Sequence, residues 1–273
     1  MERRGLGRAG GHGAIWYKAA MLIASWNVNS IKVRLPQLLN WLEQAKPDVV
    51  CLQELKCETE LFPFDALGEA GYEAAAYGQK AYNGVAILSR LPIENPVEGF
   101  AGEEGQARLI EATINGVTVL SCYAPNGQAV GSDKFAYKLR FFEALRRHLD
   151  GLGNSGLPLV LAGDFNVAPD ERDVWDAAKC AGDIGFHPDE HKALKRLTDW
   201  GLVDSFRLHD ARPGQFSWWD YRGFGFGKDR GMRIDQLWIS KALEKRCKSA
   251  RIDIEPRKLE KPSDHTPVLC EIE

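Results

Sequence analysis

The stretch that decides the fold reads Leu157-Pro158-Leu159-Val160-Leu161-Ala162-Gly163-Asp164-Phe165-Asn166. Its first part is a short apolar run bounded by turn residues, which is typical of a buried β-strand. The run ends in an acid, and an amide follows two residues later, where an extended chain would present it on the same side. Polar groups at the ends of rigid strands are typical of catalytic sites. The stretch therefore predicts a core strand and a functional site at its end.

The same pattern recurs along the chain and predicts further strands. Apolar or β-branched runs place them at residues 21–28, 48–53, 73–77, 84–89, 108–114, 117–123, 157–164, 234–240, 249–254 and 267–272. Helical spacing of apolar residues predicts helices at 34–44, 63–70, 133–149, 171–178 and 189–200. These elements do not alternate as a strict βαβ repeat would require. We expect an α/β fold of two stacked sheets flanked by helices, formed as one domain by residues 21–273.

Residues 1–20 differ in composition from the rest of the chain. They carry four basic residues and one acid, and they lack the apolar core of a secretory signal. We expect a disordered N-terminal extension. The chain has no apolar run near the roughly 20 residues that a membrane span needs. Its six cysteines are scattered without metal-ligand spacing, as in a reduced compartment, so we expect a cytoplasmic protein.

Acids and amides at strand ends predict a metal site. Glu54 follows the strand at 48–53, Asn29 follows the first strand, and Asp264 precedes the last. Oxygen ligands of this kind, with few others nearby, suit Mg²⁺. Glu54 is the strongest single candidate ligand. Asn29 and Asp264 are further candidates, either directly or through water.

A histidine near the C-terminus predicts proton chemistry. His265 stands beside Asp264 in the sequence, but neighbours on a strand point to opposite faces. The acid that orients this histidine must therefore come from another part of the chain. Glu54, Asp164 and Asp235, each at or near the edge of an apolar run, are the candidates, and Asp235, at the start of the strand at 234–240, is the favoured one. His265 would then donate a hydrogen bond to a phosphoryl oxygen.

The remaining strand ends supply groups that hydrolysis of a phosphodiester would need. Water must be activated, and the charge that builds on the phosphoryl oxygens must be stabilised. Asp164 is placed to accept a proton from water, and Asn166 to contact the phosphate. Tyr123 and Asn126, which close the strand at 117–123, complete a candidate phosphate clamp.

With these motifs in place, the chain resembles the exonuclease III family of abasic-site DNA repair endonucleases, within the wider endonuclease/exonuclease/phosphatase superfamily. The matching stretches occur in order through residues 21–273. They are SWNVN at 25–29, LQELK at 52–56, GVA at 84–86, YAPNG at 123–127, GDFN at 163–166, WGLVD at 200–204, FSWWDYR at 216–222, RGMRID at 230–235 and KPSDH at 261–265.

The resemblance implies a four-layer α/β sandwich, with two packed mixed β-sheets flanked by helices, and a requirement for Mg²⁺ or Mn²⁺. It implies a monomer that acts on double-stranded DNA with abasic sites or 3′ blocking groups. The implied reactions are cleavage 5′ to an abasic site, 3′→5′ exonuclease cleavage, and removal of a 3′-phosphate or other 3′-phosphodiester. The matching position in the family also implies that Asn27 supports the nucleophile. Some members carry an acid where this chain has Asn29, which makes Asn29 a weaker metal ligand here.

The resemblance also indicates how DNA would be bound. An extruded abasic nucleotide fits a small apolar pocket, and Trp218, Met232 and Ile234 are candidates for its walls. A bulky His187 near the DNA-binding face would bias the enzyme toward trimming 3′ ends. The candidate DNA contacts are Asn126, Arg108, Trp218, Tyr221, Arg222, Met232, Ile234 and His187. The net charge of −3 gives no overall basic excess, so basic residues must cluster on one face.

Three alternatives remain at this stage. The first is a 3′-end-trimming exonuclease or phosphatase with weak incision at abasic sites. The second is a phosphatase of the same superfamily acting on phosphoesters other than DNA. The third is a binding module without catalysis, which the intact set of acids, amides and histidine disfavours.

Overall fold

The computed structural model describes residues 20–273, so all of the predicted N-terminal extension except Ala20 lies outside the described residues. The strands are β1 Met21–Asn27, β2 Val49–Gln53, β3 Glu73–Tyr77, β4 Val85–Ser89, β5 Glu94–Glu98, β6 Leu109–Ile114, β7 Val117–Tyr123, β8 Leu159–Asp164, β9 Leu202–Asp204, β10 Trp218–Trp219, β11 Gly231–Met232, β12 Asp235–Ser240, β13 Cys247–Ile252 and β14 Val268–Ile272. The α-helices are α1 Ile31–Ala45, α2 Phe64–Glu69, α3 Asp133–Leu152, α4 Ala177–Cys180, α5 Pro188–Thr198 and α6 Lys241–Glu244.

The strands form two six-stranded sheets and one short ribbon. The first sheet has the order β13-β14-β1-β2-β4-β3, the second has the order β5-β6-β7-β8-β12-β9, and β10 pairs with β11. One pair in each six-stranded sheet is parallel, β1 with β2 and β7 with β8. The remaining pairs are antiparallel, so both sheets are mixed.

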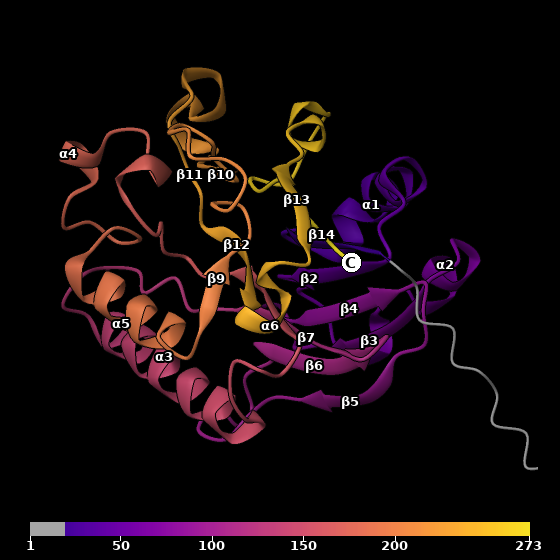
Figure 1. The fold of residues 1–273 in the computed structure, drawn as a ribbon. Coiled ribbons are helices and arrows are strands. Elements are labelled where there is room, and N and C mark those ends of the chain that lie inside the picture. The colour runs from indigo at the N-terminus through magenta and orange to yellow at the C-terminus, as the bar shows by residue number, and fades with distance from the viewer. Residues whose placement is uncertain (1–19) are drawn as a thin grey trace, which may run out of the picture.

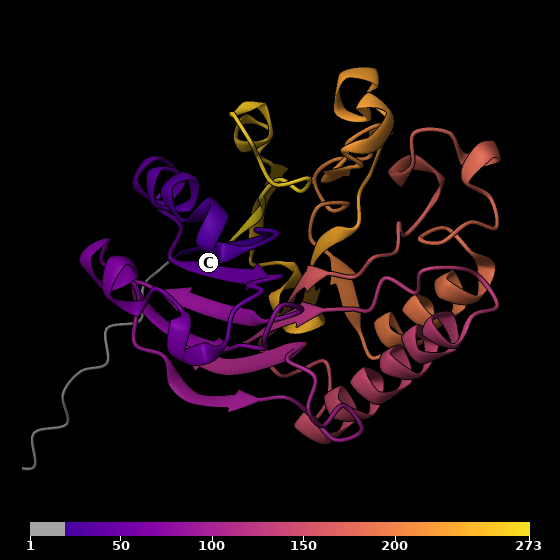
Figure 2. The same ribbon diagram turned by 180° about the vertical axis from the view of Figure 1, so that it is seen from behind.

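Side-chain alternation along the strands produces four layers. In β2, Val49 and Cys51 point into the core between the two sheets, whereas Val50 and Leu52 join the cluster that includes α1 and α2. The outer face of the second sheet packs against α3 and α5. Figures 1 and 2 show α1 and α2 on one side of the stacked sheets and α3 and α5 on the other. The predicted four-layer α/β sandwich is confirmed.

All ten predicted strands are present, with small shifts at their ends. The largest shift is in β13, which begins at Cys247 and ends at Ile252, two residues before the predicted bounds. The Asn115-Gly116 turn joins β6 to β7 with positive φ at both residues, as a tight hairpin requires.

Four strands were not predicted from the sequence. β9, β10 and β11 are two or three residues long, which is too short for a periodic pattern to register. β5 contains Pro96 and lies exposed at the edge of its sheet, where a residue without an N–H is tolerated.

The predicted helix at 171–178 is wrong. Residues Glu171–Asp173 form a 3₁₀ turn, Val174 is extended, and α4 begins at Ala177. Val174 forms a β-bridge with Met232, and the Asp173 carboxylate accepts hydrogen bonds from Arg233 at 2.6 and 3.0 Å. These tertiary contacts override the local helical preference.

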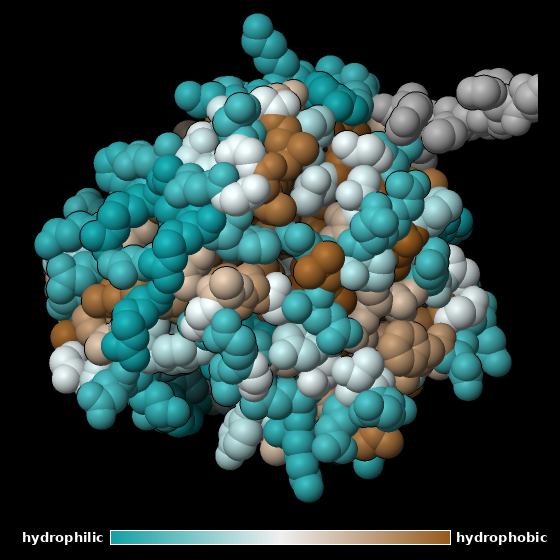
Figure 3. Space-filling model, turned by 90° about the horizontal axis from the view of Figure 1, so that it is seen from below, coloured by the Kyte–Doolittle hydropathy of each residue, from teal (hydrophilic) through white to brown (hydrophobic). Residues whose placement is uncertain are grey.

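One face of the molecule is shown in Figure 3. Hydrophilic side chains cover most of it, and the hydrophobic ones lie in small groups between them. Within residues 20–273, no helix is both long and apolar enough to cross a membrane.

Close contact between β7 and β8 predicts an effect on stability. A Cβ atom added at Gly163 would lie 1.9 Å from the backbone oxygen of Cys122. We expect Gly163→Ala to lower the free energy of unfolding by about 3 kcal/mol or more, because backbone atoms cannot move aside easily. Urea unfolding followed by circular dichroism would measure this.

The matched control is Gly151→Ala in α3, where an added Cβ meets nothing within 4 Å. There we expect a gain of roughly 0.5–1 kcal/mol from the better helix former. Equal stability of Gly163→Ala and wild type would contradict the close pairing of β7 with β8.

Candidate active site

The predicted site residues lie at one end of the stacked sheets, where several inner strands begin or end. In the second sheet, Asp164 at the end of β8 is in register with Asp235 at the start of β12 and with Tyr123 at the end of β7. In the first sheet, Asn27 ends β1 and Glu54 directly follows β2. Residues 264 and 265 come just before β14, which runs antiparallel to β1. Both sheets therefore present polar groups at the same end.

Asn27 links the two sheets. Its side-chain Nδ2 donates to Glu54 Oε1 and to Asp164 Oδ2, each at 2.9 Å. Asn27 is fully buried, so these bonds are protected from competing water. A single amide thus fixes two carboxylates that come from different sheets.

His265 is held by the acid predicted from the sequence. Its Nδ1 lies 2.9 Å from Asp235 Oδ2, and its Nε2 lies 3.8 Å from Asp164 Oδ2. Ser217 Oγ donates to the same Asp235 oxygen at 2.6 Å and accepts from the Asp235 backbone N–H at 3.0 Å. Burial alone would lower the pKa of His265, but Asp235, Asp164 and Asp264 raise it to about 10. The imidazole is therefore held as a cation at neutral pH.

Asp164 is buried and accepts several hydrogen bonds. Besides Asn27, the backbone N–H of Asn166 donates to Asp164 Oδ1 at 2.9 Å. Burial raises the pKa of Asp164, the charge of His265 opposes that shift, and Asp235 adds to it. A carboxylate with a raised pKa is a stronger base once it is ionised.

Tyr123 is supported by Arg108. The guanidinium lies 5.0 Å from the centre of the Tyr123 ring, and its Nη1 donates to the Tyr123 backbone oxygen at 3.1 Å. The same guanidinium lies 5.9 Å from the ring of Tyr137. Burial, followed by the charges of Glu54 and Asp164, raises the pKa of Tyr123. Its hydroxyl therefore stays protonated and can donate a hydrogen bond.

The oxygen ligands grouped around Glu54 are of the kind that binds a divalent cation. Side-chain atoms of Glu54, Asp164 and His265 lie within 4.8 Å of one another, but a protonated imidazole cannot ligate a metal, so the two carboxylates are the available donors. The side chain of Glu54 remains accessible, and Lys56 Nζ already lies 2.8 Å from its Oε2, so the position accepts positive charge. Carboxylate oxygens that keep access to water suit Mg²⁺ better than softer metals.

Asp264 and Asn29 are hydrogen-bonded within the site, as Glu54 is. One Asp264 oxygen accepts from Asn29 Nδ2 at 2.8 Å, and the other accepts from the Trp218 indole at 3.1 Å. Asn29 Oδ1 in turn accepts from Lys56. These two candidate ligands are thus engaged with protein donors.

A pocket of about 310 Å³ opens beside these groups. Its polar wall is formed by candidates from the sequence, and its apolar wall includes Trp218, Met232 and Ile234 as predicted. The sequence did not point to Ile184 and Gly185, which come from an irregular loop. The lining residues are Glu54, Tyr123, Asn126, Asp164, Asn166, Ile184, Gly185, Trp218, Met232, Ile234, Asp264 and His265.

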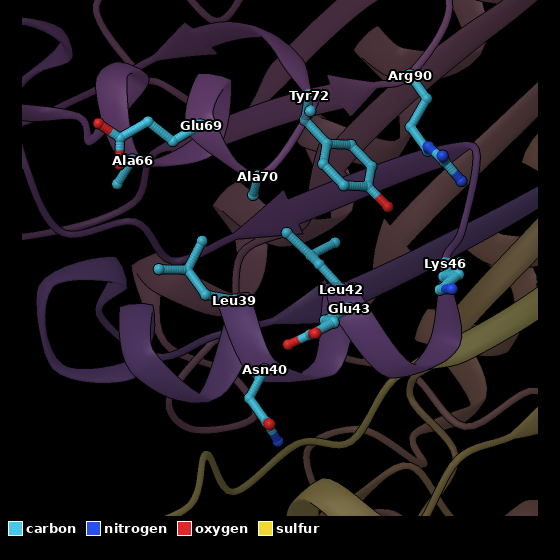
Figure 4. Close-up of a pocket in the computed structure, with 11 residues that line it drawn as sticks. Leu39, Asn40, Leu42, Glu43, Lys46, Ala66, Glu69, Ala70, Tyr72 and Arg90 are labelled. Atoms are coloured by element: carbon cyan, nitrogen blue, oxygen red, sulfur yellow. The ribbon is translucent and has the colours of Figure 1, made fainter.

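A larger cavity, of about 670 Å³, lies elsewhere between α1 and α2 (Figure 4). Leu39, Leu42 and Tyr72 form much of its wall, with charged groups of both signs at its rim. The smaller pocket is the better candidate site, because acids, amides and a histidine converge on it.

Four DNA-contact candidates lie outside the pocket. Tyr221 and Arg222 are exposed, and Arg222 pairs with Asp220 at 2.8 Å. Arg108 is half-buried against Tyr123, as described above. His187 caps the N-terminus of α5, where its Nδ1 accepts from the Asp189 N–H at 3.1 Å.

Two polar residues at the site escaped the sequence analysis. Ser217, which holds Asp235, lies within the matching stretch at 216–222 but carries no signal distinct from a turn serine. Lys56 lies two residues after Glu54, and that spacing on an extended chain could have placed both side chains on one side.

Comparisons with known proteins agree with this geometry. The model of the Endonuclease/Exonuclease/phosphatase family matches residues 24–265. Exodeoxyribonuclease III of Haemophilus influenzae is 35% identical over 265 residues, covering 92% of this chain and 99% of that protein.

Two solved structures are also similar. The 3′ phosphatase NExo from Neisseria, bound to a product DNA hairpin, has a TM-score of 0.90 and 41% identity, covering 93% of this chain and 99% of that chain. An AP endonuclease from Archaeoglobus fulgidus has a TM-score of 0.90 and 36% identity, with the same coverage.

The contact between Asp235 and His265 predicts how the histidine titrates. Because its pKa is raised above the ordinary value, the proton on His265 stabilises the folded protein fully below about pH 6.5. That contribution is lost as the pH rises through about 10. We expect Asp235→Asn to lower the pKa of His265 by at least about one unit, since a charge in direct contact is removed. Nuclear magnetic resonance of the imidazole in metal-free protein would follow the titration.

The exposed His209, which lies outside the site, provides a reference signal in the same spectra. An unchanged titration of His265 in Asp235→Asn would show that Asp235 does not hold its proton.

Proposed function

Because this chain belongs to the endonuclease/exonuclease/phosphatase family, in the group of exodeoxyribonuclease III, we propose that it is a metal-dependent DNA repair nuclease. The family assignment made from the sequence is thereby confirmed. The proposed reaction is hydrolysis of phosphodiesters 5′ to abasic sites, together with removal of nucleotides and phosphates from 3′ ends. One observation carries the proposal: Glu54 and Asp164, linked by Asn27, line one small pocket together with His265, which is held by Asp235.

The proposed cofactor is Mg²⁺, with Mn²⁺ as a substitute. When bound, such a cation would neutralise charge on the phosphoryl oxygens. Glu54 would hold it, because its carboxylate is accessible and is oriented by Asn27. Asp264, which lines the same pocket, is a further candidate, and the neutral amide of Asn29 is a weaker one.

Asp164 is the proposed base. Its carboxylate would accept a proton from the attacking water, and Asn27 and Asn166 would hold it in one orientation. Burial favours this role, because a desolvated carboxylate takes up a proton more readily than one in water.

The phosphate would be held by donors around the pocket. The His265 cation would donate from Nε2 to a phosphoryl oxygen, while Asp235 keeps Nδ1 occupied. Tyr123 and the amide of Asn126 would donate to other oxygens of the phosphate. Donors fixed before the substrate binds stabilise developing charge without having to reorganise.

The pocket and its surroundings support a DNA substrate. Its volume of about 310 Å³ lies at the lower end for ligand pockets, which suits a sugar without its base. A second groove, of about 530 Å³, is lined by Lys32, Lys56 and Lys80. It shares Lys56 with the site, so one DNA strand could pass from one to the other with its phosphates near basic groups.

A second candidate is an enzyme that acts mainly at 3′ ends and incises abasic sites weakly. The position of His187 favours it: the ring packs edge-on against Phe135 at 5.1 Å, two residues after Gly185 of the pocket wall. The similar Neisseria protein is described as a 3′ phosphatase. We propose that the His187 side chain, which follows this wall in the sequence, would hinder duplex DNA that continues past the cleaved bond.

The proposed function predicts activity on two DNA substrates. We expect Mg²⁺-dependent cleavage of a fluorescent duplex with a central abasic site, and release of phosphate from a nick with a 3′-phosphate. EDTA should abolish both. Asp164→Asn should lower kcat on each by on the order of 100-fold or more, because the base is lost.

The matched control is Asp150→Asn, an exposed carboxylate on α3 that pairs with Arg146. It should retain wild-type kcat. If Asp164→Asn kept kcat within tenfold of wild type, the assigned base would be wrong. Hydrolysis of soluble phosphomonoesters without DNA cleavage would support a phosphatase acting on other substrates.

The second candidate has its own test. We expect His187→Gly to raise abasic incision relative to 3′-phosphate removal by on the order of tenfold, through better positioning of continuous duplex. Gly is tolerated where a helix begins, so α5 should persist. His209→Gly, at an exposed position, is the control and should leave the ratio unchanged. An unaltered ratio in His187→Gly would eliminate the role of this side chain.

A further inference from the structure

A lysine is buried beneath the proposed site. Lys138 lies on α3, and its side chain is fully buried. Its Nζ donates to the backbone oxygen of Asn166 at 2.7 Å and to that of Asn126 at 3.1 Å. The ammonium therefore holds the backbone of two residues whose side chains line the pocket, without entering the pocket itself.

The partner of this lysine is equally buried. Glu190 lies on α5, pairs with Lys138 through Oε1, and has no exposed side-chain surface. Its Oε2 accepts from the backbone N–H of Gly185 at 2.8 Å and from that of His187 at 3.0 Å. Gly185 lines the pocket, so the same ion pair also holds the pocket's irregular wall.

The loops held in this way are linked to Asp164. Asn126 Nδ2 donates to Asn166 Oδ1 at 3.1 Å, and Asn166 Nδ2 lies 3.3 Å from Asp164 Oδ2. Asn166 has a φ of +53°, and its carbonyl oxygen accepts from Lys138. A change at Lys138 would therefore shift the amides that orient the carboxylate.

Burying two charges is costly, and such a pair contributes little to stability compared with apolar residues of similar size. Two apolar side chains would fill the same space, but they would leave four backbone groups without these hydrogen bonds. The four contacts of Lys138 and Glu190 with backbone groups reach three separate loops. They therefore indicate a role in holding these loops together.

We propose that the ion pair of Lys138 and Glu190 positions the active site, by fixing the loops that carry Asn126, Asn166 and Gly185 relative to one another. This inference rests on the proposed function, since it takes the pocket to be the catalytic site. Both are positioning residues, because neither reaches the pocket.

The test compares Lys138→Met with a control in the same helix. Methionine keeps the length of the side chain but removes the charge and the donors. We expect kcat on the abasic duplex to fall by on the order of 100-fold, with KM changed only a few-fold, because misplaced groups cost rate more than binding. In addition, the side-chain amide signals of Asn126 and Asn166 should shift in nuclear magnetic resonance spectra.

The control is Leu145→Ala, a fully buried residue of α3 that packs in the apolar cluster beneath the second sheet. It should lower the Tm but keep kcat within about twofold of wild type when assayed well below the Tm. If Lys138→Met retained kcat within twofold and left both amide signals in place, the inference would be overturned.

A second variant and a separate measurement ensure that each outcome tests the inference. If Lys138→Met does not fold, Glu190→Gln removes one charge at constant size, and the same kcat, KM and amide measurements apply. If wild-type protein cleaves neither DNA substrate, the proposed function fails. The amide signals then decide separately whether the ion pair positions the loops.

Discussion

The compensation of buried negative charge is the constraint on which the rest of this structure depends. Glu54, Asp164, Asp235 and Asp264 come together at one end of the sheets, and like charges at short range repel strongly where water is excluded. His265 offsets part of this charge, because three of these acids raise its pKa and keep it protonated. Amide, hydroxyl and indole donors satisfy most of the remaining oxygens. Glu54 and Asp264 stay partly exposed and both line the pocket, whereas Asp164 and Asp235 are buried.

This constraint explains why two stacked sheets are needed. Asp164 and Asp235 face each other across β8 and β12, whereas His265 comes from the segment before β14 in the other sheet. Slipping either pairing by one residue would turn the side chain to the opposite face and leave a buried charge without a partner. The register of both sheets and the chemistry of the site are therefore fixed together. Asn27, which reaches across the interface between the sheets, reinforces the same alignment.

The sequence was most informative where a long apolar run ends in a polar residue. Asp164 and Glu54 could be placed because the runs before them are unmistakable strands. Side-chain alternation argued against Asp264 as the partner of His265 and left Asp235 as one of three candidate acids; the structure shows the contact with Asp235. Lys138 was missed although a signal existed: it lies three residues after Phe135 and four before Phe142, on the apolar stripe of α3. A lysine on such a stripe indicates a buried partner. No comparable signal marks Ile184 and Gly185, because an irregular loop reaches the pocket only through tertiary contacts.

The balance of local charge matters more for a DNA substrate than the net charge of −3. At physiological ionic strength, exposed charges act over about 8 Å, so an approaching phosphate responds to the groups nearest to it. Around the pocket these include the His265 cation and Lys56, which lies 2.8 Å from Glu54. Lys32 and Lys80 continue the positive charge along the neighbouring groove. Asn29 contributes to this balance, because a carboxylate at that position would add a fifth acid beside Asp264. Neutral Asn29 instead accepts from Lys56 and donates to Asp264, and so joins the cationic and the acidic sides of the site.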